Sequence, residues 1–394
     1  MKKKIEDKGT LLVAGLVLGI VVCCLYLFYR QALNPTGPFA IGKPYGSDLP
    51  VHIKFALEKT SHYSIYYYIL RIINKLNGGL NPIGCSLFLT SLIVGTFLIN
   101  KFFFRYYGFD KSAAGLLSVL LLFTASIALP AVFPFFYYTQ LNTQPWHNGP
   151  YLLMRLLIFP LLIYYFKIKE GYRESFKGKD VSLFILFSVL CCLSKPSFML
   201  AFYPVMLIGL IADLVRDGIK KIANQILFGC LAFPSLGILL YQYIASFSGI
   251  TEAGEESGIV FGLGGTEPLE VVIMSTLRLI FGLAFPLYVI WSGGRKEINK
   301  TEIKTALLLY ATAFLETILL HESGAREADG NFGWGMPAAA YVLMAYSLVA
   351  FFGRFHEREK WDKITGIVIA SCHYLTGIVY FIVIMLGESA PALM

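Results

Sequence analysis

Long apolar runs alternate with short polar or basic segments from one end of the chain to the other. The first run, at 11–29, has no charged residue and is long enough to cross roughly 30 Å of hydrocarbon as an α-helix. Because such runs recur along the whole sequence, the pattern predicts about 11 transmembrane helices. The predicted spans are 11–29, 82–100, 112–131, 150–166, 181–194, 197–213, 225–246, 268–291, 304–320, 336–353 and 364–386.

The segment at 181–194 is short for a span. An alternative is a re-entrant hairpin formed with 197–213 and bent at Ser194–Ser197. Non-helical backbone at that depth must be buried in protein or line a wet cavity. Both alternatives leave later loops on the same side of the membrane.

The longest polar-containing segment, 30–81, lies between the first two predicted spans. Residues 48–59 predict a short helix with an N-cap residue and an early proline. Residues 63–76 predict an amphipathic, tyrosine-rich helix of the kind that lies in the membrane interface. We therefore expect a long extracytoplasmic loop that contains membrane-lying helices.

Composition supports a membrane protein over a soluble one. Hydrophobic residues make up 56% of the chain and charged residues 15%, against about 25% charged residues in soluble domains. A β-barrel would show short segments of alternating polarity. We predict an all-α, polytopic helical fold, with 1–394 as a single integral membrane domain. The first span is too long for a signal peptide and is expected to be a retained anchor.

Charge is distributed unevenly between the two sets of loops. The loops on the N-terminal side contain 23 of the 33 lysines and arginines. The positive-inside rule then places the N-terminus in the cytoplasm and the C-terminus outside. The net charge of +8 reflects this asymmetry and favours contact with anionic lipid rather than nucleic acid.

Motifs for several chemistries are absent from the sequence. All seven cysteines fall in or beside apolar runs, so no disulfide framework or cysteine metal site is indicated. We find no Walker A loop, serine-centred nucleophile elbow or HExxH motif. A divalent ion on Asp48, Glu322 or Asp329 has no further support, and we predict no cofactor.

The stretch HESGAREADGNFGWG at 321–335 is a polar island between two predicted spans. One interpretation is structural, with Glu322 and Arg326 pairing if the preceding helix continues for one turn. The other is a binding site for phosphate or sugar, in which Arg326 grips a phosphate and Trp334 stacks on a sugar ring. We favour the second because His321, Glu322, Arg326, Asn331 and Trp334 crowd together at the membrane boundary.

A second island, PWHNGP, precedes the fourth predicted span. His147 and Asn148 either begin that helix or face an outer cavity. Arg155 follows within the span, where it can snorkel outward or meet a lipid-linked phosphate. Two further cations, Lys195 and Arg278, are also candidates for binding an anionic ligand.

Buried charges usually face a partner or a wet cavity. Arg278 in the eighth span either pairs with Glu316 in the ninth or neutralises a phosphate.

The third island, YGSDLPVH, contains Asp48 and His52, which share one face of the predicted helix. Asp48 is either an N-cap that accepts backbone hydrogen bonds or a carboxylate that takes a proton from a sugar hydroxyl. His52 either assists or sits at the interface.

This layout resembles the GT-C class of membrane glycosyltransferases. Asp48 in YGSDLPVH matches the position of the class's catalytic carboxylate, and HYSIYYYIL is similar to the aromatic run that follows it in bacterial members. WHNGPYLLMR and GNFGWG are similar to stretches of bacterial polysaccharide-assembly proteins of this class. The chain lacks an Asp-Asp or Asp-Glu pair at Asp48 and lacks a large soluble C-terminal domain.

The resemblance implies a plasma (inner) membrane enzyme that moves a sugar from a polyprenyl-phosphate donor to a glycan or lipid acceptor of the cell envelope. Asp48 would be the general base, and displacement would invert the anomeric centre. Three alternatives remain: a transporter or flippase for lipid-linked saccharide, a membrane acyltransferase that uses His147 or His321, and a non-catalytic partner subunit. Polar islands that gather on one side of the membrane favour the enzyme over the transporter.

Overall fold

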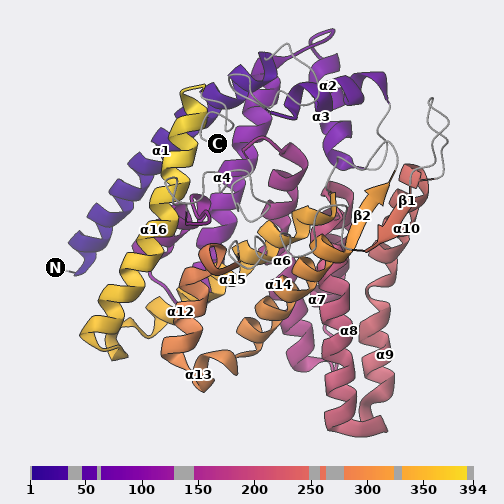
Figure 1. Cartoon of the computed structure of the whole chain (residues 1–394), viewed down its shortest axis with the longest axis vertical. Coiled ribbons are helices and arrows are strands. Elements are labelled where there is room, and N and C mark those ends of the chain that lie inside the picture. Colours follow the sequence, from indigo (N-terminus) through magenta and orange to yellow (C-terminus); the bar gives the residue numbers. More distant parts are fainter. Residues whose placement is uncertain are drawn as a thin grey trace.

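The computed structural model is an all-helical bundle to which one small two-stranded sheet is added (Figure 1). It describes residues 2–33, 47–59, 64–127, 146–247, 258–262, 279–323 and 331–387. The α-helices in these parts are α1 (Lys2–Leu33), α2 (Leu49–Glu58), α3 (Ile65–Lys75), α4 (Pro82–Tyr106), α5 (Lys111–Leu122), α6 (Gly149–Gly171), α7 (Gly178–Ser194), α8 (Ser197–Asp217), α9 (Ile222–Cys230), α10 (Phe233–Phe247), α12 (Ala284–Gly293), α13 (Arg295–Ile298), α14 (Thr301–Leu319), α15 (Gly335–Gly353) and α16 (Lys360–Met385).

Within these residues, six helical stretches are long and apolar enough to cross a membrane. They make the chain a multi-pass membrane protein. One stretch covers Ser197–Cys230, but the chain reverses inside it at Gly218, whose φ of 63° is left-handed. Glycine adopts this conformation without the steric cost that other residues incur. α9 therefore returns alongside α8 (Figure 1).

α15 forms the centre of the bundle. Nearly all of its side chains are buried, which is expected of a helix that is apolar all round. Ala338, Ala339 and Ala340 in its first half are each at most 3% exposed, and small residues of this kind let neighbouring helices approach closely. α1 lies at the periphery, with Leu11 75% and Leu18 65% exposed, as suits a helix that contacts lipid.

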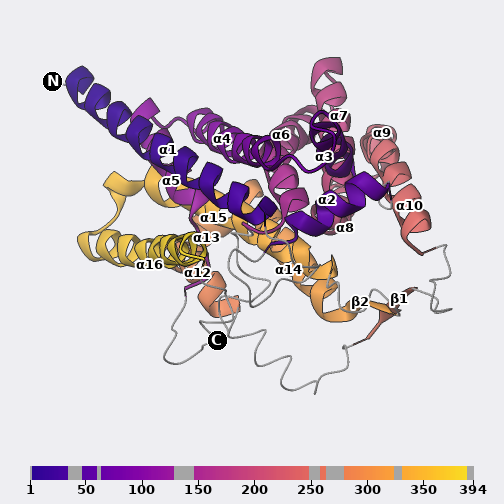
Figure 2. The same cartoon turned by 90° about the horizontal axis from the view of Figure 1, so that it is seen from above.

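The two predicted loop helices are present. α2 and α3 lie across the ends of α6, α7 and α8 (Figures 1 and 2). Ser64 caps α3 by accepting a hydrogen bond from the Tyr66 N–H at 3.3 Å, and its own hydroxyl donates to the Ser194 carbonyl at 2.7 Å. The loop is therefore tied to the end of α7. The end of the bundle that α2 and α3 cover is called the α2–α3 end below.

The predicted span at 112–131 does not continue as one helix, because α5 ends at Leu122 and 123–127 are not helical; 128–131 lie outside the described residues. Beyond this point the Ala125 N–H donates to the His373 carbonyl of α16 at 3.3 Å. The His373 Nδ1 donates to the Ala125 carbonyl at 2.6 Å, and its Nε2 accepts from the Phe285 N–H at 3.3 Å. Gly377 allows the approach, since a Cβ there would lie 1.6 Å from the Phe123 carbonyl oxygen.

Other predicted boundaries also change. α7 and α8 are two continuous antiparallel helices separated at Lys195 and Pro196 (Figure 1). The predicted span at 225–246 is divided at Leu231–Ala232 into α9 and α10. Of the predicted span at 268–291, residues 268–278 lie outside the described residues.

The small sheet was not predicted. β1 (Gly258–Phe261) pairs antiparallel with β2 (Leu320–Ser323), which directly follows α14, so that Ile259 lies opposite Glu322.

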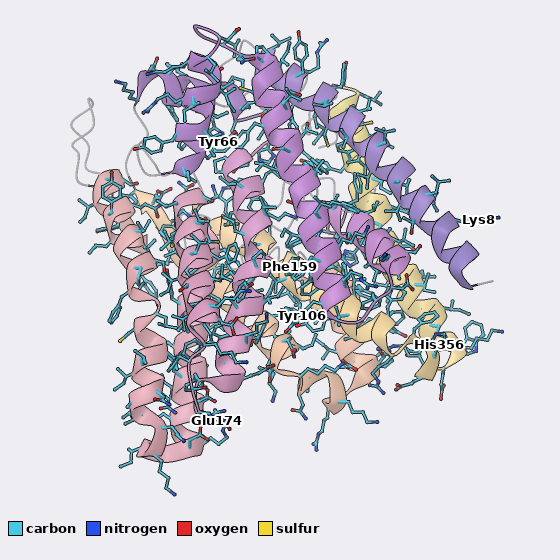
Figure 3. The ribbon with its side chains drawn as sticks, turned by 180° about the vertical axis from the view of Figure 1, so that it is seen from behind. Lys8, Tyr66, Tyr106, Phe159, Glu174 and His356 are labelled. Carbon is cyan, nitrogen blue, oxygen red and sulfur yellow. The ribbon has the colours of Figure 1, made fainter. Side chains whose placement is uncertain are left out.

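Ion pairs gather at the end of the bundle opposite to α2 and α3. Figure 3 shows Tyr66 at one end and Glu174 and His356 at the other. At that opposite end, Asp213 accepts from Arg173 at 2.9 Å and from Arg216 at 2.7 Å. These contacts join the α6–α7 loop to the end of α8.

Replacing Gly377 by alanine should destabilise the bundle. The new methyl group would press on the backbone of Phe123, which cannot rotate away, and overpacking of this kind costs about 1–3 kcal/mol. We expect a lower midpoint of thermal unfolding in detergent. Gly237→Ala in α10 is the matched control, because a Cβ there meets nothing within 4 Å. Equal midpoints for the two variants would contradict the close contact between α16 and Phe123.

Candidate functional site

A cavity of about 920 Å³ lies at the α2–α3 end. Its wall is formed by α2, the start of α3, the N-terminal ends of α6 and α8, α10, the sheet and the turn that precedes α15. Eight of the twelve predicted site residues line it: Asp48, His52, His147, Asn148, Lys195, Glu322, Asn331 and Trp334. The structure thus brings four segments that are distant in sequence around one space.

Asp48 occupies the N-cap position of α2, but its carboxylate makes no capping hydrogen bond. The Ser47 hydroxyl accepts from the Leu49 N–H instead, at 3.1 Å. The half-buried Asp48 side chain turns toward α6, where its Oδ2 accepts a hydrogen bond from Asn148 Nδ2 at 3.0 Å. The capping interpretation of Asp48 is therefore wrong, and the carboxylate remains exposed to the cavity.

The side-chain amide of Asn148 makes two hydrogen bonds. Its Oδ1 caps α6 by accepting from the Tyr151 N–H at 3.1 Å, while its Nδ2 donates to Asp48. Since the two contacts use opposite ends of the amide, they determine its orientation. The neighbouring His147 carbonyl accepts from the Asp48 N–H and from the Ser47 hydroxyl, each at 3.2 Å. The start of α6 thus holds the start of α2.

His52 lies one helical turn after Asp48 and is 7% exposed. Its ring contacts Tyr66 and Tyr67 edge-on, with ring centres 5.5 and 5.4 Å away. Burial lowers the pKa of His52 from 6.5 to about 4, with Asp48 opposing the shift and Lys195 and His147 adding to it. His52 is therefore neutral at pH 7. Its Nδ1 has no hydrogen-bond partner in the part of the chain that the structure describes.

Lys195 brings a positive charge to the cavity. It stands in the break between α7 and α8, half-buried, with its ammonium nitrogen 4.6 Å from the centre of the Trp334 ring. This is within the range of a cation–π contact. The rings of His147 and Tyr151 lie 5.7 and 5.6 Å from Trp334. Trp334 thereby joins α6, the α7–α8 break and α15.

The sheet separates Glu322 from His321. Successive residues of a strand point to opposite faces. Glu322 lines the cavity and is 4% exposed, whereas His321 is not among the lining residues. The helix before them ends at Leu319, so the predicted further turn that would pair Glu322 with Arg326 is wrong. Glu322 Oε2 accepts from Asn331 Nδ2 at 2.7 Å instead.

Three other cations were predicted to bind an anionic ligand. Arg155 is 2% exposed and does not line the cavity. Its Nη2 donates to the Leu121 carbonyl at 2.9 Å, and its guanidinium lies 4.1 Å from the centre of the Tyr341 ring. Arg155 thus joins α6 to α5 and α15 in the interior, and the expectation that it snorkels outward is wrong. Arg278 and Arg326 lie outside the described residues.

Sequence reasoning missed several residues of the cavity wall. Gln242 lines it and donates to the Cys192 carbonyl at 2.8 Å. A glutamine within a predicted span was a usable signal, since polar groups in a span usually face a partner or a cavity. Leu236, Leu239 and Leu240 form an apolar wall on α10. Nothing in the sequence distinguishes these three leucines from those that face lipid.

Among the described residues, no three histidine, cysteine, aspartate or glutamate side chains are grouped so that they could hold a metal ion.

No protein-family model matches the chain, and no curated protein or solved structure matches it either.

His52 should make the protein less stable in acid. Its folded-state pKa lies below its ordinary value, so the unfolded chain binds more protons between about pH 6.5 and pH 4 and gains stability there relative to the folded state. We expect the unfolding midpoint to fall across this range. In His52→Gln, which keeps a neutral polar group, the fall should be shallower. Parallel profiles for the two proteins would show that His52 is not buried neutral.

Asn148→Asp should show the opposite pH dependence. An aspartate still caps α6, but it places a second carboxylate against Asp48. Repulsion raises the folded-state pKa of the pair, so the folded protein binds more protons and stability increases as the pH falls from about 7 to 4.

Asn148→Ser is the control for Asn148→Asp, because serine caps a helix without charge. The difference in unfolding midpoint between the two variants should shrink in acid. A constant difference would place residue 148 away from Asp48.

Proposed function

We propose that the protein is a membrane glycosyltransferase that moves a sugar from a polyprenyl-phosphate donor to an acceptor hydroxyl of a cell-envelope glycan or lipid. One observation carries this proposal. Asp48, whose carboxylate makes no capping hydrogen bond, and Lys195, a cation, line the same cavity. Glycosyl transfer from a phosphate needs a group that accepts a proton and a group that stabilises the departing phosphate.

In the proposed reaction, the acceptor oxygen forms a bond to the anomeric carbon as the bond from that carbon to the phosphate oxygen breaks. Asp48 takes the hydroxyl proton as general base. The polyprenyl phosphate leaves with the bonding electron pair, and Lys195 stabilises its negative charge. Direct displacement inverts the anomeric centre. Asn148, which donates to Asp48 Oδ2, leaves the second carboxylate oxygen, Oδ1, for the acceptor.

The shape and lining of the cavity suit an amphipathic donor. Its volume of about 920 Å³ lies within the range of ligand sites, about 300–1,000 Å³. Tyr67 and Trp334 provide aromatic faces on which a sugar ring can stack, and α10 provides an apolar wall. On the same helix Leu240 is 60% and Ile244 52% exposed, which suits contact with lipid. A prenyl chain would follow this wall.

The orientation of the bundle is also a proposal. Glu174 lies at the end opposite to α2 and α3 (Figure 3), next in sequence to Arg173, which pairs with Asp213 together with Arg216. The positive-inside rule assigns such a basic end to the cytoplasm. The cavity would then open on the extracytoplasmic side of the plasma membrane. Transfer there needs a lipid-linked donor, which agrees with the apolar wall.

Asp48→Asn should abolish transfer while the protein stays folded. Asparagine keeps an acceptor for Asn148 but cannot take a proton, and loss of a general base lowers the rate by about 10²–10⁴-fold. The assay uses full-length protein in proteoliposomes and a panel of radiolabelled polyprenyl-monophosphate hexoses and pentoses. It follows both sugar transfer to envelope glycan and release of free sugar. Thermal unfolding checks the fold.

His147→Gln is the companion variant. If Asp48→Asn turned over donor at the wild-type rate, Asp48 would not be the base. If instead Asp48→Asn stayed active while His147→Gln lost all activity toward activated acyl donors, the acyltransferase alternative would replace this proposal.

A further inference from the structure

The break between α7 and α8 places two helix ends at the wall of the cavity. The two ends differ in the hydrogen-bond partners of their main-chain groups. At the end of α7, three of the last four carbonyl groups accept a hydrogen bond. The Cys191 carbonyl accepts from the Lys195 N–H at 3.1 Å. The Cys192 carbonyl accepts from Gln242 at 2.8 Å, and the Ser194 carbonyl from Ser64 at 2.7 Å. Three separate donors thus bind carbonyl groups at this end of the helix.

The start of α8 differs. Its N-cap residue is Pro196, and no side chain among the described residues caps the helix. The first N–H groups of an α-helix have no partner within the helix. Pro196 and Ser197 both line the cavity, so the positive end of the dipole of this 21-residue helix stands at its wall. Helix N-termini of this kind bind phosphate and other oxyanions.

Two side chains add to this end of α8. Lys195 precedes the N-cap residue Pro196, and its ammonium lies over the Trp334 ring. His52 is 7% exposed, lines the same cavity, and has an Nδ1 without a partner in the described part of the chain. A buried polar atom without a partner costs free energy. This cost is recovered when a ligand supplies the missing hydrogen bond.

We propose that the N-terminus of α8, together with Lys195 and His52, is a binding site for a phosphate monoester. The charged ammonium and the backbone N–H groups would bind the phosphate oxygens, and the neutral imidazole of His52 would bind a hydroxyl or protonated oxygen of the same ligand. The inference rests on the proposed function for the identity of that phosphate, which would be the leaving group of the donor. The binding site itself is independent of catalysis.

The test measures binding to full-length protein in phosphatidylcholine nanodiscs, with inorganic phosphate and farnesyl phosphate as probes. Lys195→Gln should weaken binding of both probes by about tenfold, the scale of a lost charge-assisted hydrogen bond. Lys195→Arg should retain binding. Equal affinities for wild type and Lys195→Gln would overturn the proposal.

A second pair of variants tests the helix end itself. Pro196→Asp introduces a carboxylate where the phosphate is proposed to bind, and Pro196→Asn introduces a neutral side chain of the same size. The aspartate should raise the unfolding midpoint, because it complements the helix dipole, and should weaken phosphate binding by at least tenfold relative to the asparagine. If both variants bound phosphate equally, the N-terminus of α8 would not be the site.

Two further arms separate the possible ligands and the two proposals. Phosphatidylglycerol in the nanodisc should not compete with farnesyl phosphate; if it competed with equal strength, the site would be a phospholipid headgroup site and the monoester proposal would fall. Asp48→Asn should bind farnesyl phosphate as well as wild type does. If the wild-type protein bound farnesyl phosphate but transferred no sugar, only the proposed function would be wrong. If it transferred sugar without binding phosphate at α8, only this inference would be wrong.

Discussion

The hydrogen bond from Asn148 to Asp48 is the interaction on which the candidate site depends. Asn148 Oδ1 begins α6, a 23-residue helix, and its Nδ2 reaches Asp48 at 3.0 Å. The loop that carries α2 is thereby anchored to a helix that runs through the bundle. Ser64 anchors the same loop to the end of α7. A carboxylate on a long loop would otherwise sample many positions, and catalysis requires one.

The packing of the bundle explains why polar groups gather at one end. α15 fills the centre with apolar side chains, so the space beside it at mid-depth is occupied. At the α2–α3 end, several helices begin or end and their main-chain groups need partners. Gln242 and Ser64 donate to two of these main-chain carbonyls, and Lys195 and His52 line the cavity beside them. The cavity is thus a consequence of where helices stop.

Much of the helical layout could be predicted from apolar periodicity, including α2 and α3 within the first loop. Predictions failed where one segment depends on another. α5 stops early because His373 and Gly377 of α16 hold the following residues. The strand at Glu322 exists through β1, a partner that lies far away in sequence. Asp48 does not cap α2, because Ser47 does. Such outcomes depend on neighbours that a one-dimensional pattern does not identify.

The β1–β2 pair has a consequence for how this site can change over evolution. Its register sets Glu322 against Ile259 and leaves His321 on the other face. Because strand side chains alternate with a period of two, a slip of one residue would exchange them. Inserting a single residue after α14 would therefore put His321 in the place of Glu322 in the wall without altering any residue type. Chain length in this connection acts as a determinant of cavity charge.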